Sequence, residues 1–204
     1  MSEAVAAHGE ALPAHVLAVW RDSREIHSPA AVEAAIARMA DAIREDLAGQ
    51  DPLVLSVLIG ALVPVAMLLP QLDFPLQLDC VHATRYRGET RGAELQWRSY
   101  PSHSLQGRHV LLVDDILDEG LTLAALMNWC REQGAASVRV AVLAEKQHER
   151  NHSGIRADYT GLTVPDAYVF GSGMDYRDYL RNVPGIRAVD DKYLKAGGSQ
   201  ACWR

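Results

Sequence analysis

Apolar runs and helical apolar stripes alternate along this chain, and together they predict its elements. Apolar runs bounded by turn residues predict buried strands, whereas apolar residues three and four positions apart predict helices. The predicted strands cover 52–60, 76–84, 95–100, 108–115, 137–146 and 186–189, and short strands and turns are predicted within 158–182. The predicted helices cover 28–49, 61–72 and 121–134. Strands that alternate with helices favour an α/β fold with a parallel sheet and right-handed crossovers.

The segment 28–49 carries the clearest helix signals. Ser28 is a good N-cap, Pro29 suits the first turn, and Gly49 is placed to end the helix. The apolar face of this helix is made by Val32, Ile36, Met39 and Ile43. We expect it either to pack on the core or to join a subunit interface.

The chain divides into three predicted regions. Residues 1–50 form an N-terminal helical region with an Ala-rich, loose start over 1–14. Residues 51–190 form the core, and 191–204 form a C-terminal tail that is expected to fray.

Composition and charge then narrow the class of protein. A net charge of −6 and a pI near 5.7 argue against nucleic acid or an anionic membrane as the main partner. Three scattered cysteines suit free thiols in a reducing cytosol better than a disulfide framework or a zinc site. No signal peptide is evident, and the longest apolar run, 53–70, is broken by Ser56, Gly60 and two prolines. We therefore expect a cytoplasmic protein that has no membrane partner.

Four acids stand where the predicted strand 108–115 meets the helix 121–134, in the stretch VLLVDDILDEGLTLAAL. A loop that enters a helix directs several N–H groups the same way; Gly120 allows close approach of a ligand and Thr122 adds a hydroxyl. Asp114 and Asp115 suit hydroxyl groups or a hard cation such as Mg²⁺. The alternative to a ligand-binding role is a purely structural one, in which the acid pair caps turns and keeps the loop solvated. A phosphate cradle beside a diol site describes a ribose 5-phosphate.

The motifs themselves resemble a known family. VLLVDDILDEGLTL (110–123) is similar to the phosphoribosyl-pyrophosphate (PRPP) signature of type I phosphoribosyltransferases. VFGSGMDYRDYLRNVPGI (169–186) resembles a segment of the hypoxanthine-guanine phosphoribosyltransferases. The resemblance covers about residues 50–190 and includes VLIGALVP, LDFPLQLDCVHATRYRG, AELQW and AVLAEKQHER. It implies the type I phosphoribosyltransferase fold, a parallel twisted sheet flanked by helices, with a small hood region and a flexible lid loop.

The same resemblance implies roles for the acids and the loop that follows them. Asp114 and Asp115 would hold the ribose hydroxyls, directly or through Mg²⁺, and Asp118 would face purine N7 and accept its proton. The N–H groups of the loop would bind the 5-phosphate; its residues are Asp118, Glu119, Gly120, Leu121 and Thr122. Glu119 and Leu121 depart from the small, polar or basic residues common there, so the Glu119 carboxylate must point away from the phosphate.

Purine-binding roles fall on Lys146, Tyr168 and Val169. Lys146 would donate to purine O6, Tyr168 would stack on the base, and the backbone of Val169 would read the ring edge. The alternatives are a surface charge for Lys146 and a core aromatic for Tyr168.

Pyrophosphate and lid roles complete the implied site. Arg181 would grip pyrophosphate, and Asp175 would serve a Mg²⁺ on that side. The pyrophosphate loop, 58–61, contains an unusual cis peptide in this family; here Ile59 replaces a common lysine before Gly60. Arg85 and Tyr86 begin the lid segment 85–94, which would close over the substrates and exclude water.

The implied activity is transfer of 5-phosphoribosyl from PRPP to N9 of hypoxanthine or guanine, with Mg²⁺, by a homodimer or homotetramer. Two alternatives stay open: a PRPP-binding regulator without catalysis, and an enzyme that prefers another 6-oxopurine such as xanthine. Adenine is disfavoured, because its amino group would meet Lys146 where an oxygen is wanted.

Overall fold

The residues that the structure describes form two β-sheets, and the larger one forms the centre of the fold. The computed structural model describes residues 13–85, 95–148 and 153–195. The six-stranded sheet has the order β4-β3-β2-β5-β6-β7, and every neighbouring pair is parallel except β3 with β4. Its strands are β2 (Leu53–Val57), β3 (Gln77–Arg85), β4 (Leu95–Ser99), β5 (His109–Leu117), β6 (Ser137–Gln147) and β7 (Tyr159–Pro165). The predicted parallel α/β architecture is confirmed.

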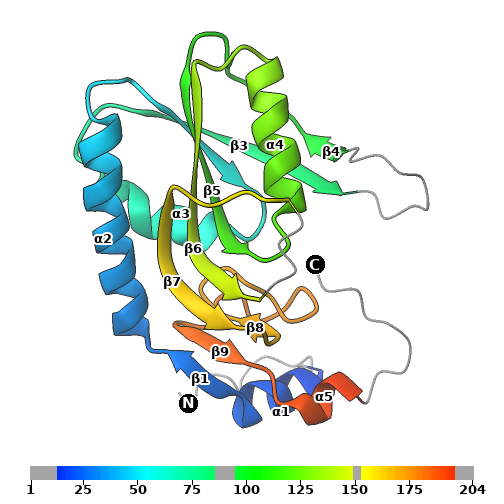
Figure 1. Ribbon diagram of the computed structural model, residues 1–204. Helices are drawn as coiled ribbons and strands as arrows, with labels where there is room; N and C mark the ends of the chain where they lie inside the picture. Colours follow the sequence, from blue (N-terminus) through cyan, green and yellow to red (C-terminus); the bar gives the residue numbers. More distant parts are fainter. Residues whose placement is uncertain (1–12, 86–94, 149–152, 196–204) are drawn as a thin grey trace.

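Helices cover both faces of this sheet (Figure 1). The helices α2 (Pro29–Leu47) and α3 (Leu62–Leu68) contact each other on one face, and α4 (Leu121–Glu132) lies on the opposite face. A short 3₁₀ helix, η2 (Leu69–Gln71), follows α3. The fully buried β2 and the apolar side of α2 belong to one hydrophobic core. The helix predicted over 28–49, which is α2, therefore packs on the core.

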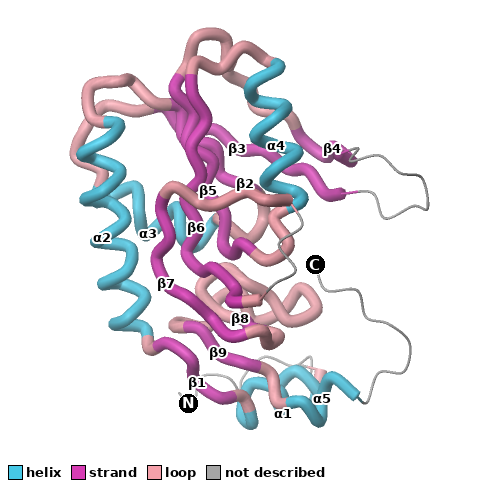
Figure 2. Tube along the Cα trace, in the orientation of Figure 1, coloured by secondary structure: helices cyan, strands magenta, loops and turns pink. Residues whose placement is uncertain are grey.

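A second, three-stranded sheet lies beyond the carboxyl ends of β5 and β6. It has the antiparallel order β1-β9-β8, with β1 (Arg24–His27), β9 (Ile186–Ala188) and β8 (Val169–Phe170). Two helices, α1 (Ala14–Asp22) and α5 (Asp191–Lys195), accompany this sheet, which has its own apolar cluster. Figure 2 shows the loops gathered between the two sheets, where parallel sheets bind their ligands.

Local chemistry explains most element boundaries. The Ser28 hydroxyl accepts a hydrogen bond from the Ala31 N–H at 3.2 Å, which is the expected cap of α2. The strand predicted over 52–60 ends at Val57, because the chain turns over and the Ala61 N–H already bonds the Val57 carbonyl. In contrast, β5 runs on to Leu117, two residues past its predicted end at 115.

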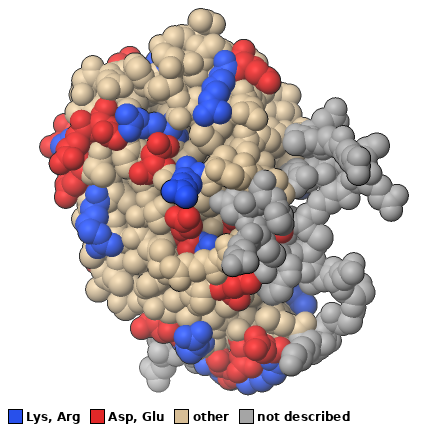
Figure 3. Space-filling model, in the orientation of Figure 1, with Lys and Arg blue, Asp and Glu red and all other residues tan. Residues whose placement is uncertain are grey.

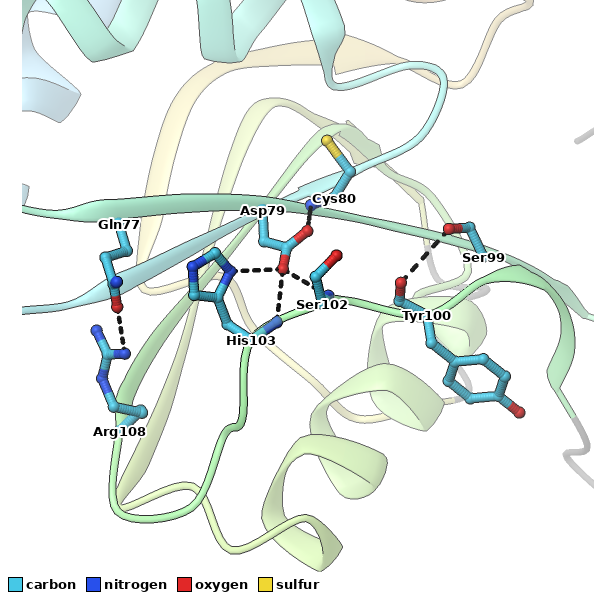
Figure 4. Close-up of polar contacts among 8 residues, drawn as sticks. All are labelled: Gln77, Asp79, Cys80, Ser99, Tyr100, Ser102, His103 and Arg108. Atoms are coloured by element: carbon cyan, nitrogen blue, oxygen red, sulfur yellow. Dashed lines mark hydrogen bonds and ion pairs between the residues drawn. The ribbon is translucent and has the colours of Figure 1, made fainter.

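A partly buried carboxylate ties the segment between β4 and β5 to the sheet (Figure 4). Asp79 on β3 accepts hydrogen bonds from the backbone N–H groups of Cys80, Ser102 and His103 at 2.7, 2.7 and 2.9 Å. The His103 ring nitrogen Nδ1 lies 2.8 Å from the same carboxylate. Burial raises the pKa of Asp79, but these hydrogen bonds outweigh it, and the pKa lies below its ordinary value.

The surface charges are mixed. Figure 3 shows basic and acidic side chains interspersed over one face, without a continuous basic area among the residues drawn in colour. Within the described residues, no helix is both long and apolar enough to cross a membrane.

Candidate active site

The loop between β5 and α4 forms a cradle for an anion. Gly120 stands at the N-cap of the 12-residue helix α4 with φ +74°, and a Cβ there would lie 2.4 Å from the Ser153 hydroxyl oxygen. Only glycine fits both the left-handed backbone and the space. No side chain in the described chain caps α4, so its first N–H groups, from Leu121 and Thr122 onward, are available to a ligand. Glu119 is exposed at this turn.

Two successive acids precede the cradle at the end of β5. The Asp115 N–H donates to a carboxylate oxygen of Asp114 at 2.9 Å, and the Asp115 side chain is 13% exposed. Burial raises the pKa of Asp114 well above its ordinary value, and the charge of Asp115 adds to the shift. Burial also raises the pKa of Asp115, although a hydrogen bond with Asp114 and the charge of Arg181 oppose it. Hydroxyl donors or a cation would stabilise both carboxylates in their charged form.

Arg181 joins these acids to the loop that follows β8. Its Nη2 lies 2.6 Å from Oδ1 of Asp175, and its Nη1 lies 3.8 Å from Oδ2 of Asp115. Nη1 also donates to the Gly173 carbonyl at 2.7 Å. The turns that carry Arg181 have positive φ values at Arg177, Asp178 and Leu180. Such conformations cost free energy and cluster at functional sites.

The predicted pyrophosphate loop lies against the same acids. The Leu58–Ile59 peptide bond is cis, as the resemblance implies, and the Ile59 side chain is among the exposed apolar ones. A Cβ on Gly60 would lie 2.1 Å from Oδ2 of Asp115, and a Cβ on Gly173 would lie 2.2 Å from the Gly60 carbonyl oxygen. A side chain at Gly60 would push the loop away from Asp115, and a side chain at Gly173 would push it away from the turn that follows β8.

A second group of polar side chains forms around Asp118, just past β5. Nζ of Lys146, on β6, lies 2.6 Å from one Asp118 oxygen, and Nε2 of His148 lies 2.5 Å from the other. The side chains of Lys146 and His148 are only 7% and 4% exposed. Burial raises the pKa of Asp118, but the hydrogen bonds and charges of Lys146 and His148 outweigh it, so the pKa is lowered.

His148 was not predicted. A polar residue directly after a strand looks like any solvated loop residue, and the contact with Asp118 spans 30 positions of sequence. No local pattern marks such a pair.

Tyr168 and Val169 stand at the second sheet. Val169 is buried as the first residue of β8. The Tyr168 ring meets the Tyr176 ring edge-on at 5.6 Å between centroids, and its hydroxyl accepts a hydrogen bond from the Arg177 N–H at 3.4 Å. These contacts join Tyr168 to the turn at Tyr176 and Arg177, which follows β8.

The predicted lid begins at the end of β3. Arg85 is the last residue of β3, whereas Tyr86 and the rest of the predicted lid up to 94 lie outside the described residues.

Within the described ranges, no cluster of three or more His, Cys, Asp or Glu residues is arranged to hold a metal ion by itself. Mg²⁺ characteristically takes one or two carboxylates plus substrate phosphates and water, which two adjacent carboxylates fit.

Comparison with known proteins agrees with this geometry. The family model of the phosphoribosyl transferase domain matches residues 22–178. The hypoxanthine-guanine phosphoribosyltransferase of Streptococcus pneumoniae (strain ATCC BAA-255 / R6) is 34% identical over 151 residues, covering 74% of this chain and 83% of the relative. That of Bacillus subtilis (strain 168) is 37% identical over 136 residues, covering 66% and 75%. A hypoxanthine-guanine-xanthine phosphoribosyltransferase of Tritrichomonas foetus is 31% identical over 163 residues, covering 80% and 89%.

Solved structures carry the same fold over nearly their whole length. A hypoxanthine-guanine-xanthine phosphoribosyltransferase superposes with a TM-score of 0.73 at 28% identity, over 83% of this chain and 95% of that one. A hypoxanthine-guanine phosphoribosyltransferase from Bacillus anthracis superposes with a TM-score of 0.75 at 26% identity, over 82% and 97%. The chain therefore belongs to the phosphoribosyltransferase family, in its hypoxanthine-guanine branch.

Proposed function

We propose that this protein transfers 5-phosphoribosyl from PRPP to N9 of hypoxanthine or guanine, giving IMP or GMP and pyrophosphate in purine salvage. The relatives named for this reaction support it. The observation that carries it is the pairing of Lys146 with Asp118 at 2.6 Å, beside the anion cradle.

This pair complements one edge of a 6-oxopurine. Along that edge, O6 accepts a hydrogen bond and a protonated N7 donates one. An ammonium donor next to a carboxylate acceptor matches this order, with Lys146 toward O6 and Asp118 toward N7. Adenine presents an amino donor in place of O6 and would leave Lys146 facing another donor. The side chains therefore favour hypoxanthine and guanine over adenine.

Asp118 acts as the general base. Its low pKa in the free protein keeps it ionised, with Lys146 and His148 as its partners. When Lys146 turns to O6, Asp118 loses one stabilising partner and becomes a stronger base toward N7–H. N9 then bonds to C1 of the ribose while the C1–oxygen bond breaks, and pyrophosphate leaves with the electron pair.

The ribose phosphate lies along the end of β5. The 5-phosphate binds the N–H groups of the turn from Asp118 to Thr122, and Asp114 and Asp115 accept hydrogen bonds from the ribose hydroxyls. Their negative charge also favours the positive charge that develops on the sugar. Asp114 and Asp115 would hold Mg²⁺ on the ribose side; when bound, the ion would supply positive charge that stabilises phosphate oxygens.

Pyrophosphate binds between Arg181 and the turn that holds Ile59 and Gly60. The ion pairs of the guanidinium with Asp115 and Asp175 support this role, because they hold it in one position before substrate arrives. Asp175, which is paired with Arg181, would serve a Mg²⁺ on this side. Ile59 offers no charge, so the positive charge for pyrophosphate comes from Arg181 and would be supplemented by Mg²⁺ when the ion is bound.

The second sheet and the lid complete the enclosure. The Tyr168 ring stacks on the base, and the Val169 backbone reads the ring edge. The resemblance further implies that the segment 85–94, which begins with Arg85 and Tyr86, would close over the substrates and keep water from the activated sugar.

The assembly is a homodimer or homotetramer in the cytoplasm. In the related hypoxanthine phosphoribosyl transferase of Trypanosoma cruzi, the C-terminal region has a role in the oligomeric state. The free thiols Cys80 and Cys130 suit a reducing compartment. Sedimentation velocity of the purified chain tests the assembly, and a monomer at working concentration would contradict it.

The activity is tested by a spectrophotometric screen of four bases with PRPP and Mg²⁺. We expect turnover of hypoxanthine and guanine and little or none of adenine. Xanthine belongs in the screen because the Tritrichomonas foetus relative is named for it as well. A chain that turns over adenine best, or none of the four bases, would contradict the proposal.

A further inference from the structure

The carboxylate of Asp118 is held from two sides before any substrate binds. Lys146 contacts Oδ2 at 2.6 Å, and His148 contacts Oδ1 at 2.5 Å. The two partners differ in what the proposed reaction asks of them. Lys146 has to turn toward purine O6, whereas nothing in the reaction requires His148 to move. This inference rests on the proposed function.

His148 is well placed to keep its contact. It is the first residue after β6, and its side chain is 4% exposed, so packing fixes the ring. An imidazole with a proton on Nε2 donates a hydrogen bond whether the ring is neutral or charged. Because the Asp118 carboxylate can only accept, Nε2 of His148 is the donor in this contact.

The base must stay oriented while its other partner leaves. The Asp118 side chain is 28% exposed, on a turn that also carries the phosphate cradle. A carboxylate with a single anchor would rotate once Lys146 turned to O6, and catalysis falls steeply with small misplacements of a reacting group. The second anchor removes this freedom at the moment of proton transfer.

We propose that His148 is a positioning residue for the general base: it holds one oxygen of Asp118 while Lys146 passes from the other oxygen to the purine. His148 thus acts through Asp118 and does not itself exchange a proton with substrate.

The test compares two variants of His148. His148→Leu fills similar space but has no donor, and His148→Gln restores an N–H at a comparable distance from the backbone. We expect His148→Leu to lower kcat with hypoxanthine by about 10-fold or more, the equivalent of one charged hydrogen bond. The KM for PRPP should change less than about twofold, because the phosphate cradle and Arg181 are untouched. His148→Gln should recover most of the rate. Gln147→Ala, at the exposed neighbouring position, is the matched control and should keep wild-type kinetics.

A double-mutant cycle separates positioning from packing. If His148 acts through Asp118, then His148→Leu added to Asp118→Asn should slow the enzyme little beyond Asp118→Asn alone. An equal loss in both backgrounds, or an unchanged kcat in His148→Leu, would overturn the inference. So would failure of both His148→Leu and His148→Ala to fold while His148→Gln folds, since His148 would then be a folding residue. No turnover of any 6-oxopurine by the wild-type chain would instead overturn the proposed function, and this inference with it.

Discussion

Replacing Asp118 by Asn tests the chemistry with a minimal change of shape. The carboxylate now accepts from Lys146 at 2.6 Å and from His148 at 2.5 Å. An Asn side chain keeps one acceptor oxygen, but its amide nitrogen must face one of these two donors. It also cannot take a proton from N7. The variant therefore loses the base outright and loosens the local hydrogen bonding.

The magnitude of the two losses differs. Loss of a general base lowers kcat by roughly 10²–10⁴, which corresponds to about 2.7–5.4 kcal/mol of transition-state stabilisation. Loss of one charged hydrogen bond costs about 1.5–3 kcal/mol of unfolding free energy. Because the Asp118 side chain is 28% exposed, we expect the lower end of that range. Catalysis should thus suffer far more than stability.

The assay is steady-state conversion of hypoxanthine to IMP at saturating PRPP and Mg²⁺, followed by ultraviolet absorbance. The KM for PRPP should stay within about threefold, because the phosphate binds backbone N–H groups. Asp41→Asn, which removes an exposed carboxylate on α2, is the matched control. A near wild-type kcat in Asp118→Asn would refute the assignment of the base.

Three further substitutions test other parts of the site and fold. Lys146→Gln should raise the KM for hypoxanthine and guanine by about 10-fold or more while changing the KM for PRPP little; an effect confined to PRPP would move Lys146 out of the purine site. Gly173→Ala places a methyl group 2.2 Å from the Gly60 carbonyl at φ +110°, so the KM for PRPP should rise; unchanged PRPP kinetics would contradict the close packing. Asp79→Asn should lower the unfolding free energy by about 1.5–3 kcal/mol at pH 7. Because the pKa of Asp79 is lowered in the folded protein, the extra stability of wild type over the variant is lost as pH falls below about 4. Urea unfolding of both proteins at pH 7 and below about pH 4 measures this difference in unfolding free energy. Equal stability of the two proteins at pH 7 would contradict the account.

The sequence predicted the parts of the fold that local patterns encode. Buried apolar runs predicted the central strands, and the Ser28 cap with the helical stripe predicted α2. The strand β1 was missed, because its sequence REIH is short and polar and it forms by pairing with β9, over 150 residues away. The helix α1 was missed as well, since no capping side chain marks its start.

The site shows the same division. The turn from Asp118 to Thr122 is contiguous, so its motif was visible in the sequence. The buried contact between Lys146 and Asp118 crosses 28 positions and depends on the parallel pairing of β5 with β6. The roles of Lys146, Tyr168 and Arg181 were implied only by resemblance, and His148 and Asp79 had no role before the structure placed their partners.

The most direct test is a structure of the complex with Mg²⁺, hypoxanthine and an unreactive PRPP analogue. The central claim is that Lys146 and Asp118 separate to bind adjacent atoms of the base. We predict Lys146 Nζ within hydrogen-bond distance of O6, an Asp118 oxygen at N7, and the His148 contact with the other oxygen retained. An intact Lys146–Asp118 pair, with the purine bound by other groups, would contradict the account.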